Sequence, residues 1–172
     1  TASLSAEVRP QVGGIIQKRL FTEGDMVKAG QALYQIDPSS YRATWNEAAA
    51  ALKQAQALVV SDCQKAQRYA SLVRDNGVSR QDADDAASTC AQDKASVESK
   101  KAALESARIN LNWTTVTAPI AGRIGISSVT PGALVTAQQD TALATIRGLD
   151  SMYVDLTRSS ADLLRLRKQT LA

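Results

Sequence analysis

The sequence predicts an α+β fold in which a small β-sandwich, made of two similar halves, is split by a long antiparallel helical hairpin. Three observations lead to this prediction. The eighty residues between Pro38 and Pro119 of the 172-residue chain contain no further Pro and a single Gly, Gly77, as expected for long helix interrupted once. The flanks on either side are rich in Val, Ile, Thr and Gly, as expected for short strands. The two flanks also repeat each other.

The flanks, at 7–38 and 112–147, share a pattern of apolar residues and glycines at a constant offset along the chain. Such a repeat indicates two similar β motifs, each with one apolar face, that close on one another. The matched pairs are Val8/Val116, Val12/Ile120, Gly14/Gly122, Ile16/Ile124, Gly24/Gly132 and Val27/Val135 and, after a two-residue insertion, Leu33/Leu143 and Ile36/Ile146.

Two helices are expected between the flanks, at about 39–75 and 79–111. Each would be roughly 50 Å long at ~1.5 Å per residue. Serines that can act as N-caps precede or begin both helices, and an Asp-Asn-Gly turn separates them. These capping and turn residues are Ser39, Ser40, Asp75-Asn76-Gly77 and Ser79 with Asp82.

Apolar residues spaced seven apart predict that the two helices pack as an antiparallel coiled coil. One register places three layers opposite each other, and Ala48, Ala55, Ala66 and Val73 fill the alternate positions of the first helix. The alternate positions expected in the second helix are charged, so the seam is thin and most of both helices lies in water. The layers are Trp45/Leu111, Leu52/Leu104 and Val59/Val97, and the charged positions are Lys94, Lys101 and Arg108.

The composition excludes most catalytic and metal sites. The chain has no His, so it offers no imidazole base and no histidine metal ligand. Its two Cys are too few for a Cys-only zinc site or an iron–sulfur cluster. The net charge of +3 comes from 20 basic and 17 acidic residues that are interspersed, unlike a nucleic-acid-binding patch. No segment approaches the roughly 18 apolar residues of a membrane span. We therefore expect no enzymatic activity, no cofactor and no nucleic-acid partner.

The stretch Glu23-Gly24-Asp25-x-Val27-x-x-Gly30-Gln31-x-Leu33 resembles the biotinyl/lipoyl carrier fold. In carriers the modified lysine lies at the turn that joins the two halves. Here that join is Asp37-Pro38 followed by the helices, and no Lys occurs from 102 to 167. A carrier function is therefore disfavoured, although it stays an alternative.

A lipoyl-like domain split by a long α-hairpin resembles the periplasmic adaptors, or membrane fusion proteins, of RND-type tripartite multidrug efflux pumps. The match is to the AcrA/MexA group, with the adaptors of MdsABC-type pumps as a narrower candidate. The stretches that carry it are Glu7-Val8-Arg9-Pro10-Gln11-Val12-x-Gly14-Ile15-Ile16, Leu33-Tyr34-Gln35-Ile36-Asp37-Pro38, Glu105-Ser106-Ala107-Arg108-Ile109-Asn110-Leu111 and Thr117-Ala118-Pro119-Ile120-x-Gly122-Arg123-Ile124-Gly125.

The resemblance implies a non-enzymatic protein in the periplasm of a Gram-negative bacterium, anchored to the inner membrane in its full-length form. Its implied partners are an inner-membrane RND transporter, a TolC-like outer-membrane channel and further copies of itself in a hexamer. The alternatives are an adaptor of an ABC-type exporter and a free-standing coiled-coil spacer; the internal repeat argues against the spacer.

Adaptors of this family share an Arg-x3-Leu-x6-Ser pattern at the hairpin tip, and Arg68, Leu72 and Ser79 match it. The resemblance implies that these residues dock on the channel. Leu72 would be an apolar knob, Arg68 one turn earlier would bond carbonyls or carboxylates of the partner, and Ser79 would offer a hydroxyl. Without the resemblance, the same residues would be read as a seam leucine, a solvated arginine and a helix-capping serine.

The two cysteines, Cys63 and Cys90, lie equally far from the centre of the expected turn. An antiparallel hairpin therefore brings them to the same height on opposite helices, within reach of a disulfide. The periplasmic location that the resemblance implies favours oxidation to a structural disulfide near the docking end; two unbonded thiols are the alternative. Their spacing excludes a catalytic CxxC motif.

The resemblance also implies that residues 1–6 and 148–172 belong to a β-barrel domain. The stretches concerned are Leu149-Asp150-x-x-Tyr153-Val154-Asp155 and Ser159-Ser160-x-Asp162-Leu163-Leu164-Arg165-Leu166. The remaining barrel strands, a membrane-proximal domain and a signal or lipidated N-terminal cysteine would then lie outside this sequence.

Overall fold

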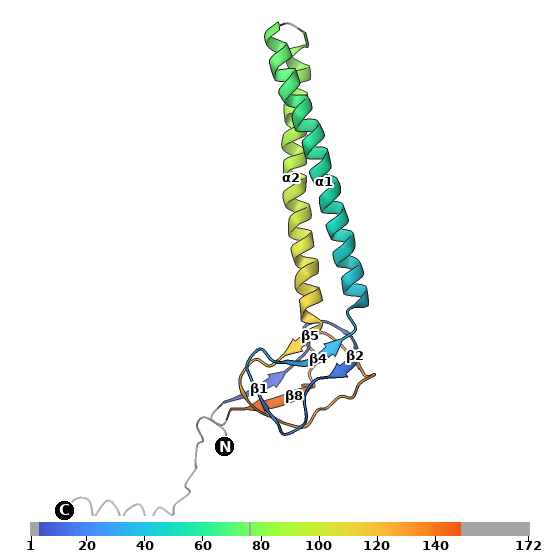
Figure 1. Cartoon of the computed structure of the whole chain (residues 1–172), viewed down its shortest axis with the longest axis vertical. Helices are drawn as coiled ribbons and strands as arrows, with labels where there is room; N and C mark the ends of the chain where they lie inside the picture. Colours follow the sequence, from blue (N-terminus) through green and yellow to red (C-terminus); the bar gives the residue numbers. More distant parts are fainter. Residues whose placement is uncertain (1–3, 76, 149–172) are drawn as a thin grey trace, which may run out of the picture.

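The computed structural model describes residues 4–75 and 77–148, which form two small β-sheets and two long helices (Figure 1). The predicted α+β class is confirmed, while the β-barrel prediction for 149–172 lies outside the described residues. The elements are β1 Ser5–Val8, β2 Gly14–Arg19, β3 Met26–Val27, β4 Ala32–Ile36, α1 Ser39–Leu72, a 3₁₀ turn at Val73–Asp75, α2 Arg80–Trp113, β5 Thr115–Thr117, β6 Gly122–Ile124, β7 Leu134–Val135 and β8 Ala144–Arg147.

The strands form two four-stranded antiparallel sheets, with the orders β1-β8-β6-β3 and β5-β4-β2-β7. Each sheet combines strands from both flanks of the chain. In one sheet Gly14 of β2 lies opposite Val135 of β7, and in the other Val27 of β3 lies opposite Gly122 of β6. Each sheet is therefore complete only when the two flanks meet.

The internal repeat is visible in the hydrogen bonds of the turns, which the two halves form at equivalent positions. In both halves a glutamine side chain accepts from the backbone N–H three residues earlier, and a glycine N–H reaches across to the other half. The matched bonds are Gln31 Oε1 with Lys28 N at 2.9 Å and Gln139 Oε1 with Thr136 N at 3.1 Å, and Gly24 N with Ile124 O at 3.0 Å and Gly132 N with Ile16 O at 2.8 Å.

The hydrophobic core lies between the sheets and contains the large apolar residues of the repeat. Its one large polar member is Tyr34, whose hydroxyl lies 2.7 Å from Ser127 Oγ and donates to Leu143 O at 3.0 Å. Burial raises the pKa of Tyr34, and the Ser127 hydrogen bond opposes that shift. Buried core residues are Val8, Val12, Ile16, Val27, Leu33, Tyr34, Ile36, Val116, Ala118, Ile124, Val135, Leu143, Ala144 and Ile146.

The start of α1 differs from the prediction that Ser39 or Ser40 caps it. Ser39 is already the first helical residue, and Pro38 at the N-cap position provides no side-chain hydrogen bond. The side-chain hydrogen bonds at the start of α1 come from Asp37 instead. Its Oδ1 accepts from the N–H of Ser39 at 3.0 Å and from the Ser39 hydroxyl at 2.6 Å. These side-chain and backbone hydrogen bonds lower the pKa of Asp37.

The helices turn over between Leu72 and Arg80. Helix α1 ends at Leu72 and continues as the 3₁₀ turn, three residues before the predicted end. Ser79 caps α2, because its hydroxyl oxygen accepts from Asp82 N at 3.1 Å, as predicted. At its other end α2 continues two residues beyond prediction, to Trp113.

The seam between the helices contains the predicted layers but has a different phase on α2. The prediction that Lys94, Lys101 and Arg108 occupy alternate seam positions is wrong, because all three are exposed. The seam instead follows Cys90 at alternating steps of three and four, and Asp93 and Ala107 replace Lys94 and Arg108; Lys100, which falls on the same pattern beside Lys101, is exposed. The at least half-buried residues of α2 include Ala86, Cys90, Asp93, Val97, Leu104, Ala107 and Leu111.

The hairpin projects from one end of the sandwich, so its turn lies far from the hydrophobic core (Figure 1). Hydrogen bonds at its base join it to the strands: Tyr41 Oη donates to Gly13 O at 2.7 Å, and Gln35 Nε2 donates to Thr114 O at 3.3 Å. Among the described residues, neither helix combines the length and apolar character needed to cross a membrane.

Candidate functional site

The free end of the hairpin presents a leucine that is supported by a glycine. Leu72, the last residue of α1, has 41% of its surface exposed. Its carbonyl accepts from the N–H of Gly77 at 2.9 Å, and a Cβ added at Gly77 would lie 3.4 Å from Leu72 Cδ2. The sequence marks Gly77 only as a turn residue, but the Leu72 side chain also packs against it.

Arg68 lies one turn before Leu72 on the same face of α1 and is exposed. Its backbone carbonyl accepts from Ser71 Oγ at 2.7 Å. Within the part of the chain that the structure describes, no ion pair involves its guanidinium. The group can therefore bond a partner without first breaking a salt bridge.

Ser79 lies at the N-cap of α2, after the turn, and its hydroxyl is hydrogen-bonded within the chain. It accepts from Asp82 N at 3.1 Å and lies 2.6 Å from Asp82 Oδ2, to which it donates. Its immediate contribution is to begin α2 and so to shape the tip.

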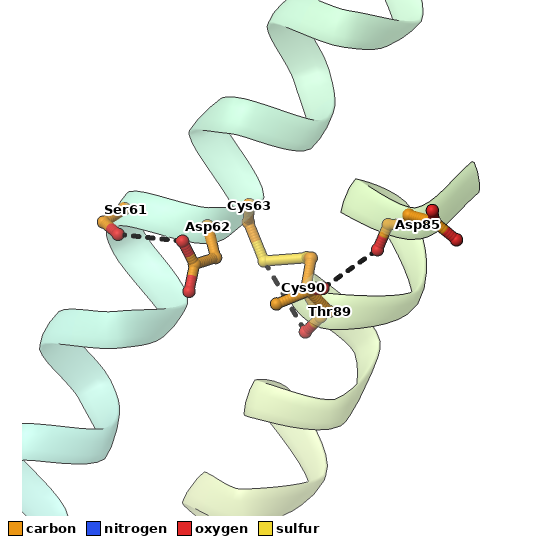
Figure 2. The surroundings of a disulfide bond; sticks show 6 residues. All are labelled: Ser61, Asp62, Cys63, Asp85, Thr89 and Cys90. Atoms are coloured by element: carbon orange, nitrogen blue, oxygen red, sulfur yellow. Dashed lines mark hydrogen bonds between the residues drawn. A yellow bond between two sulfur atoms is a disulfide. The ribbon is translucent and has the colours of Figure 1, made fainter. Parts of the chain in front are cut away.

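A disulfide joins the helices between the tip and the middle of the hairpin (Figure 2). Cys63 of α1 and Cys90 of α2 are bonded, with their Cα atoms 4.7 Å apart. Cys90 is buried in the seam. The pairing expected from the equal heights of the two residues is present, and it fixes the separation of the helices near the tip.

Three residues after Cys90, Asp93 of α2 has a buried Oδ2 atom with no hydrogen-bond partner among the described residues. Burial raises the pKa of Asp93 above its ordinary value near 3.8, and a hydrogen bond and the charge of Asp62 raise it further. The heptad spacing of the apolar residues does not point to Asp93, because it predicts the next residue, Lys94, in the seam. Alternating steps of three and four from Cys90, to Asp93 and then Val97, would have found it.

Two grooves flank the seam near the tip and differ in chemistry. One, of about 200 Å³, is polar and largely acidic; the other, of about 440 Å³, is lined mostly by alanines. In the described residues, no cluster of three or more His, Cys, Asp or Glu could hold a metal ion. The acidic groove is lined by Asp62, Lys65, Tyr69, Asp82, Asp85, Ala86 and Thr89, and the other by Ala66, Ala70, Val73, Arg80, Ala83, Asp84 and Ala87.

Residues 5–147, which include both halves of the sandwich and both helices, match the family model of the barrel-sandwich hybrid domain of RND membrane fusion proteins. The chain belongs to this family. The expected resemblance is thereby confirmed over most of the described residues.

Relatives within this membrane fusion protein family are identical to the chain at about half of the aligned residues. The chain is 51% identical over 164 residues to multidrug efflux pump subunit AcrA of Escherichia coli, covering 95% of this chain and 41% of AcrA. It is 53% identical over 164 residues to multidrug resistance protein MexA of Pseudomonas aeruginosa, covering 95% of this chain and 39% of MexA. The chain thus spans about two-fifths of the length of these curated relatives.

A similar solved structure is a chimera of MacA and MexA that contains the α-hairpin domain of Pseudomonas aeruginosa MexA. The chain is 36% identical to it with a TM-score of 0.56, and the match covers 86% of this chain and 49% of the chimera.

Proposed function

We propose that this chain is the central part of a periplasmic adaptor that links an inner-membrane RND drug transporter to a TolC-like outer-membrane channel. The observation that carries the proposal is Leu72, half exposed at the free end of a hairpin whose two helices each have 34 residues. The family supports it, because the relatives AcrA and MexA are named for multidrug efflux and resistance. The work of such a protein is assembly, and it needs no enzymatic activity.

Docking through the tip follows from the chemistry of its residues. Leu72 buries its exposed surface against a helical tip of the channel, which the hydrophobic effect favours. Arg68, on the same face, donates to backbone carbonyls or carboxylates of that tip. Ser79 holds the turn in shape by capping α2. The disulfide keeps the two helices together near the tip that docks on the channel.

The same proposal assigns parts to the rest of the chain. The hairpin, 39–111, is the spacer and docking arm. The lipoyl-like halves, 7–38 and 112–147, stack with those of further copies into a ring, as a hexamer. Residues 1–6 and 148–172 belong to the β-barrel domain. The protein functions in the periplasm of a Gram-negative bacterium, and its full-length form is anchored to the inner membrane.

Photo-crosslinking in cells tests docking. A photoreactive residue at position 72 of the full-length protein is expected to capture a TolC-like outer-membrane protein. Position 58 is the matched control, because Leu58 also lies on α1 with a similar exposure, 47% against 41%, but fourteen residues further from the tip. Capture of no outer-membrane protein from position 72, or equal capture from position 58, would contradict docking through the tip.

Charge reversal at the tip tests the role of Arg68. Arg68→Asp is expected to lower drug resistance to the level of a strain that lacks the protein, because it replaces a donor with an acceptor at the docking face. Arg108→Asp, the same change at an exposed position near the base of α2, is expected to leave resistance near the wild-type level. Circular dichroism establishes that both variants fold. Normal resistance with Arg68→Asp would refute the role.

A further inference from the structure

The outer face of the sheet β1-β8-β6-β3 carries a row of exposed side chains, here called the basic row. Met26 of β3 lies opposite Arg123 of β6, and Arg123 lies opposite Arg147 of β8. All three residues are exposed, Met26 by 63%, whereas the alternate residues Val27 and Ile124 are buried in the core. Because successive side chains of a strand point to opposite faces, the basic row points away from the core.

The charges of the basic row are not compensated within the described part of the chain. Like charges directly opposite each other on paired strands repel, and no ion pair to Arg123 or Arg147 is found within 4–75 and 77–148. Arg123 Nε donates to Gly24 O at 2.7 Å, while its two terminal nitrogens have no hydrogen bond to another described residue. The planar guanidinium group matches a carboxylate, so the row is suited to an acidic partner.

The internal repeat places an equivalent row on the outer face of the other sheet. At the offsets that relate the two halves, the equivalents of the three residues in the basic row are Leu134, Ile15 and Asp37, here called the acidic row. Leu134 of β7 lies opposite Ile15 of β2, and the N–H of Asp37 donates to Ile15 O at 2.9 Å. Leu134 and Ile15 are 74% and 50% exposed, and Asp37 is partly exposed.

The two rows are complementary in chemistry. Each has a large exposed apolar residue at the same end, and the equivalent of the cation Arg147 is the anion Asp37. Hydrogen bonds from Ser39 lower the pKa of Asp37, so its carboxylate is ionised at neutral pH. The core lies between the two sheets, so the rows face in opposite directions and cannot meet within one chain. A second copy can bring them together.

We propose that the basic row of one copy docks on the acidic row of the next copy. Met26 then packs against Leu134 of the neighbouring copy, and the guanidinium groups of Arg123 and Arg147 bind the carboxylate of its Asp37. A contact between two different surfaces of identical chains repeats from copy to copy and can close a ring. This contact rests on the proposed function, because it names the surfaces through which the sandwiches of the hexamer meet.

Cysteine crosslinking of the full-length protein in cells tests the contact. Within the described residues the native cysteines are joined in the disulfide, and wild type treated with the same bismaleimide reagent gives the background. The double variant Met26→Cys/Leu134→Cys should give a ladder of linked copies. Each single variant alone should stay monomeric, and the two single variants produced together should give dimers and nothing longer. Both side chains are exposed, so these substitutions leave the core intact.

Ile126 provides the matched control. It is 81% exposed on the same sandwich but belongs to neither row. The double variant Met26→Cys/Ile126→Cys should therefore give no ladder.

Charge variants in the double-cysteine background test the ionic part of the contact. Arg147→Glu replaces attraction by repulsion, so it should weaken each contact by more than about fivefold, the upper value for losing an exposed ion pair, and shorten the ladder. Asp37→Asn keeps an acceptor for the Ser39 N–H and should also shorten the ladder. Added to Arg147→Glu, however, it removes the new repulsion and should restore part of the ladder.

Two results would overturn the contact. One is the absence of a ladder from the Met26→Cys/Leu134→Cys variant. The other is a dimer from either single variant alone, because that would show a two-fold contact between identical faces. Capture of the channel from position 72 reports on the proposed function separately: capture without a ladder refutes only this contact, whereas the absence of both refutes docking as well.

Discussion

At the scale of single residues, the repeat pairs Gln138 with Gly30, and the two adopt the same left-handed backbone conformation. The φ angle is 52° at Gln138 and 79° at Gly30. Each is followed by a glutamine whose side chain accepts from the backbone N–H three residues earlier. The first half thus has glycine, which favours the left-handed conformation, at this position of the turn. The second half has glutamine, which disfavours it.

We therefore expect Gln138→Gly to stabilise the protein. A left-handed conformation costs a non-glycine residue roughly 1–2 kcal/mol, while glycine costs about 0.5–1 kcal/mol in chain entropy. The net gain in the free energy of unfolding should be up to about 1.5 kcal/mol, measured by urea denaturation. Gly30→Ala is the reciprocal control and should destabilise by up to about 1.5 kcal/mol, after the same entropy term is subtracted. A loss of stability in Gln138→Gly would show that the exposed glutamine side chain makes a stabilising contact.

At the scale of elements, the hairpin combines a narrow seam with a covalent link. Only Ala55 of α1 and Ala86, Cys90 and Ala107 of α2 are buried, and alanines bury little area each. The disulfide links the helices on the tip side of this seam. Because packing contributes little there, the bond should account for much of the stability of the outer hairpin.

The double variant Cys63→Ala/Cys90→Ala tests this. The disulfide joins residues 27 apart in sequence, and opening a loop of that size corresponds to a loss of roughly 3.5 kcal/mol in the chain-entropy model. Hydrogen exchange should accelerate for amides of the outer hairpin and remain slow in the sandwich strands. Reductant should have the same effect on wild type and none on the variant. Unchanged protection of the outer hairpin would show that packing alone holds it.

The sequence predicts these elements where the residues follow the expected capping, turn and seven-residue patterns, and fails where a residue departs from them. The two helices, the Ser79 cap and the Cys63–Cys90 pairing follow from turn residues and spacing. The phase of α2 does not, because Asp93 is a charged residue in a seam and the apolar pattern points away from it. The Asp37 contact is hidden for a similar reason: Ser39 is the preferred cap by residue type, but proximity of the preceding carboxylate decides the outcome.

At the scale of the whole molecule, the two halves are alike within the sandwich but differ in where the chain leaves them. After β4 the first half continues into α1, and after β8 the second half leaves the described residues. The equivalent glycines Gly14 and Gly122 face these two exits. Their φ angles are nearly the same, 153° and 157°, so any difference between them must come from their neighbours.

This asymmetry predicts unequal effects of the same substitution. A Cβ at Gly122 would collide with the backbone carbonyl oxygen of Arg147, which can move only if β8 moves. A Cβ at Gly14 would lie 2.6 Å from Cγ2 of Ile36; this methyl group belongs to a buried β-branched side chain with a restricted χ1, but it can shift without moving a backbone strand. Overpacking typically costs about 1–3 kcal/mol, so Gly122→Ala should fall at the upper end and Gly14→Ala at the lower.

Urea unfolding of the two variants beside wild type measures that difference, because both carry the same backbone strain and the same added methyl group. If Gly14→Ala were the more destabilising of the two, Ile36 would be unable to rotate. The junction between the sandwich and α1 would then be the more rigid exit of the fold.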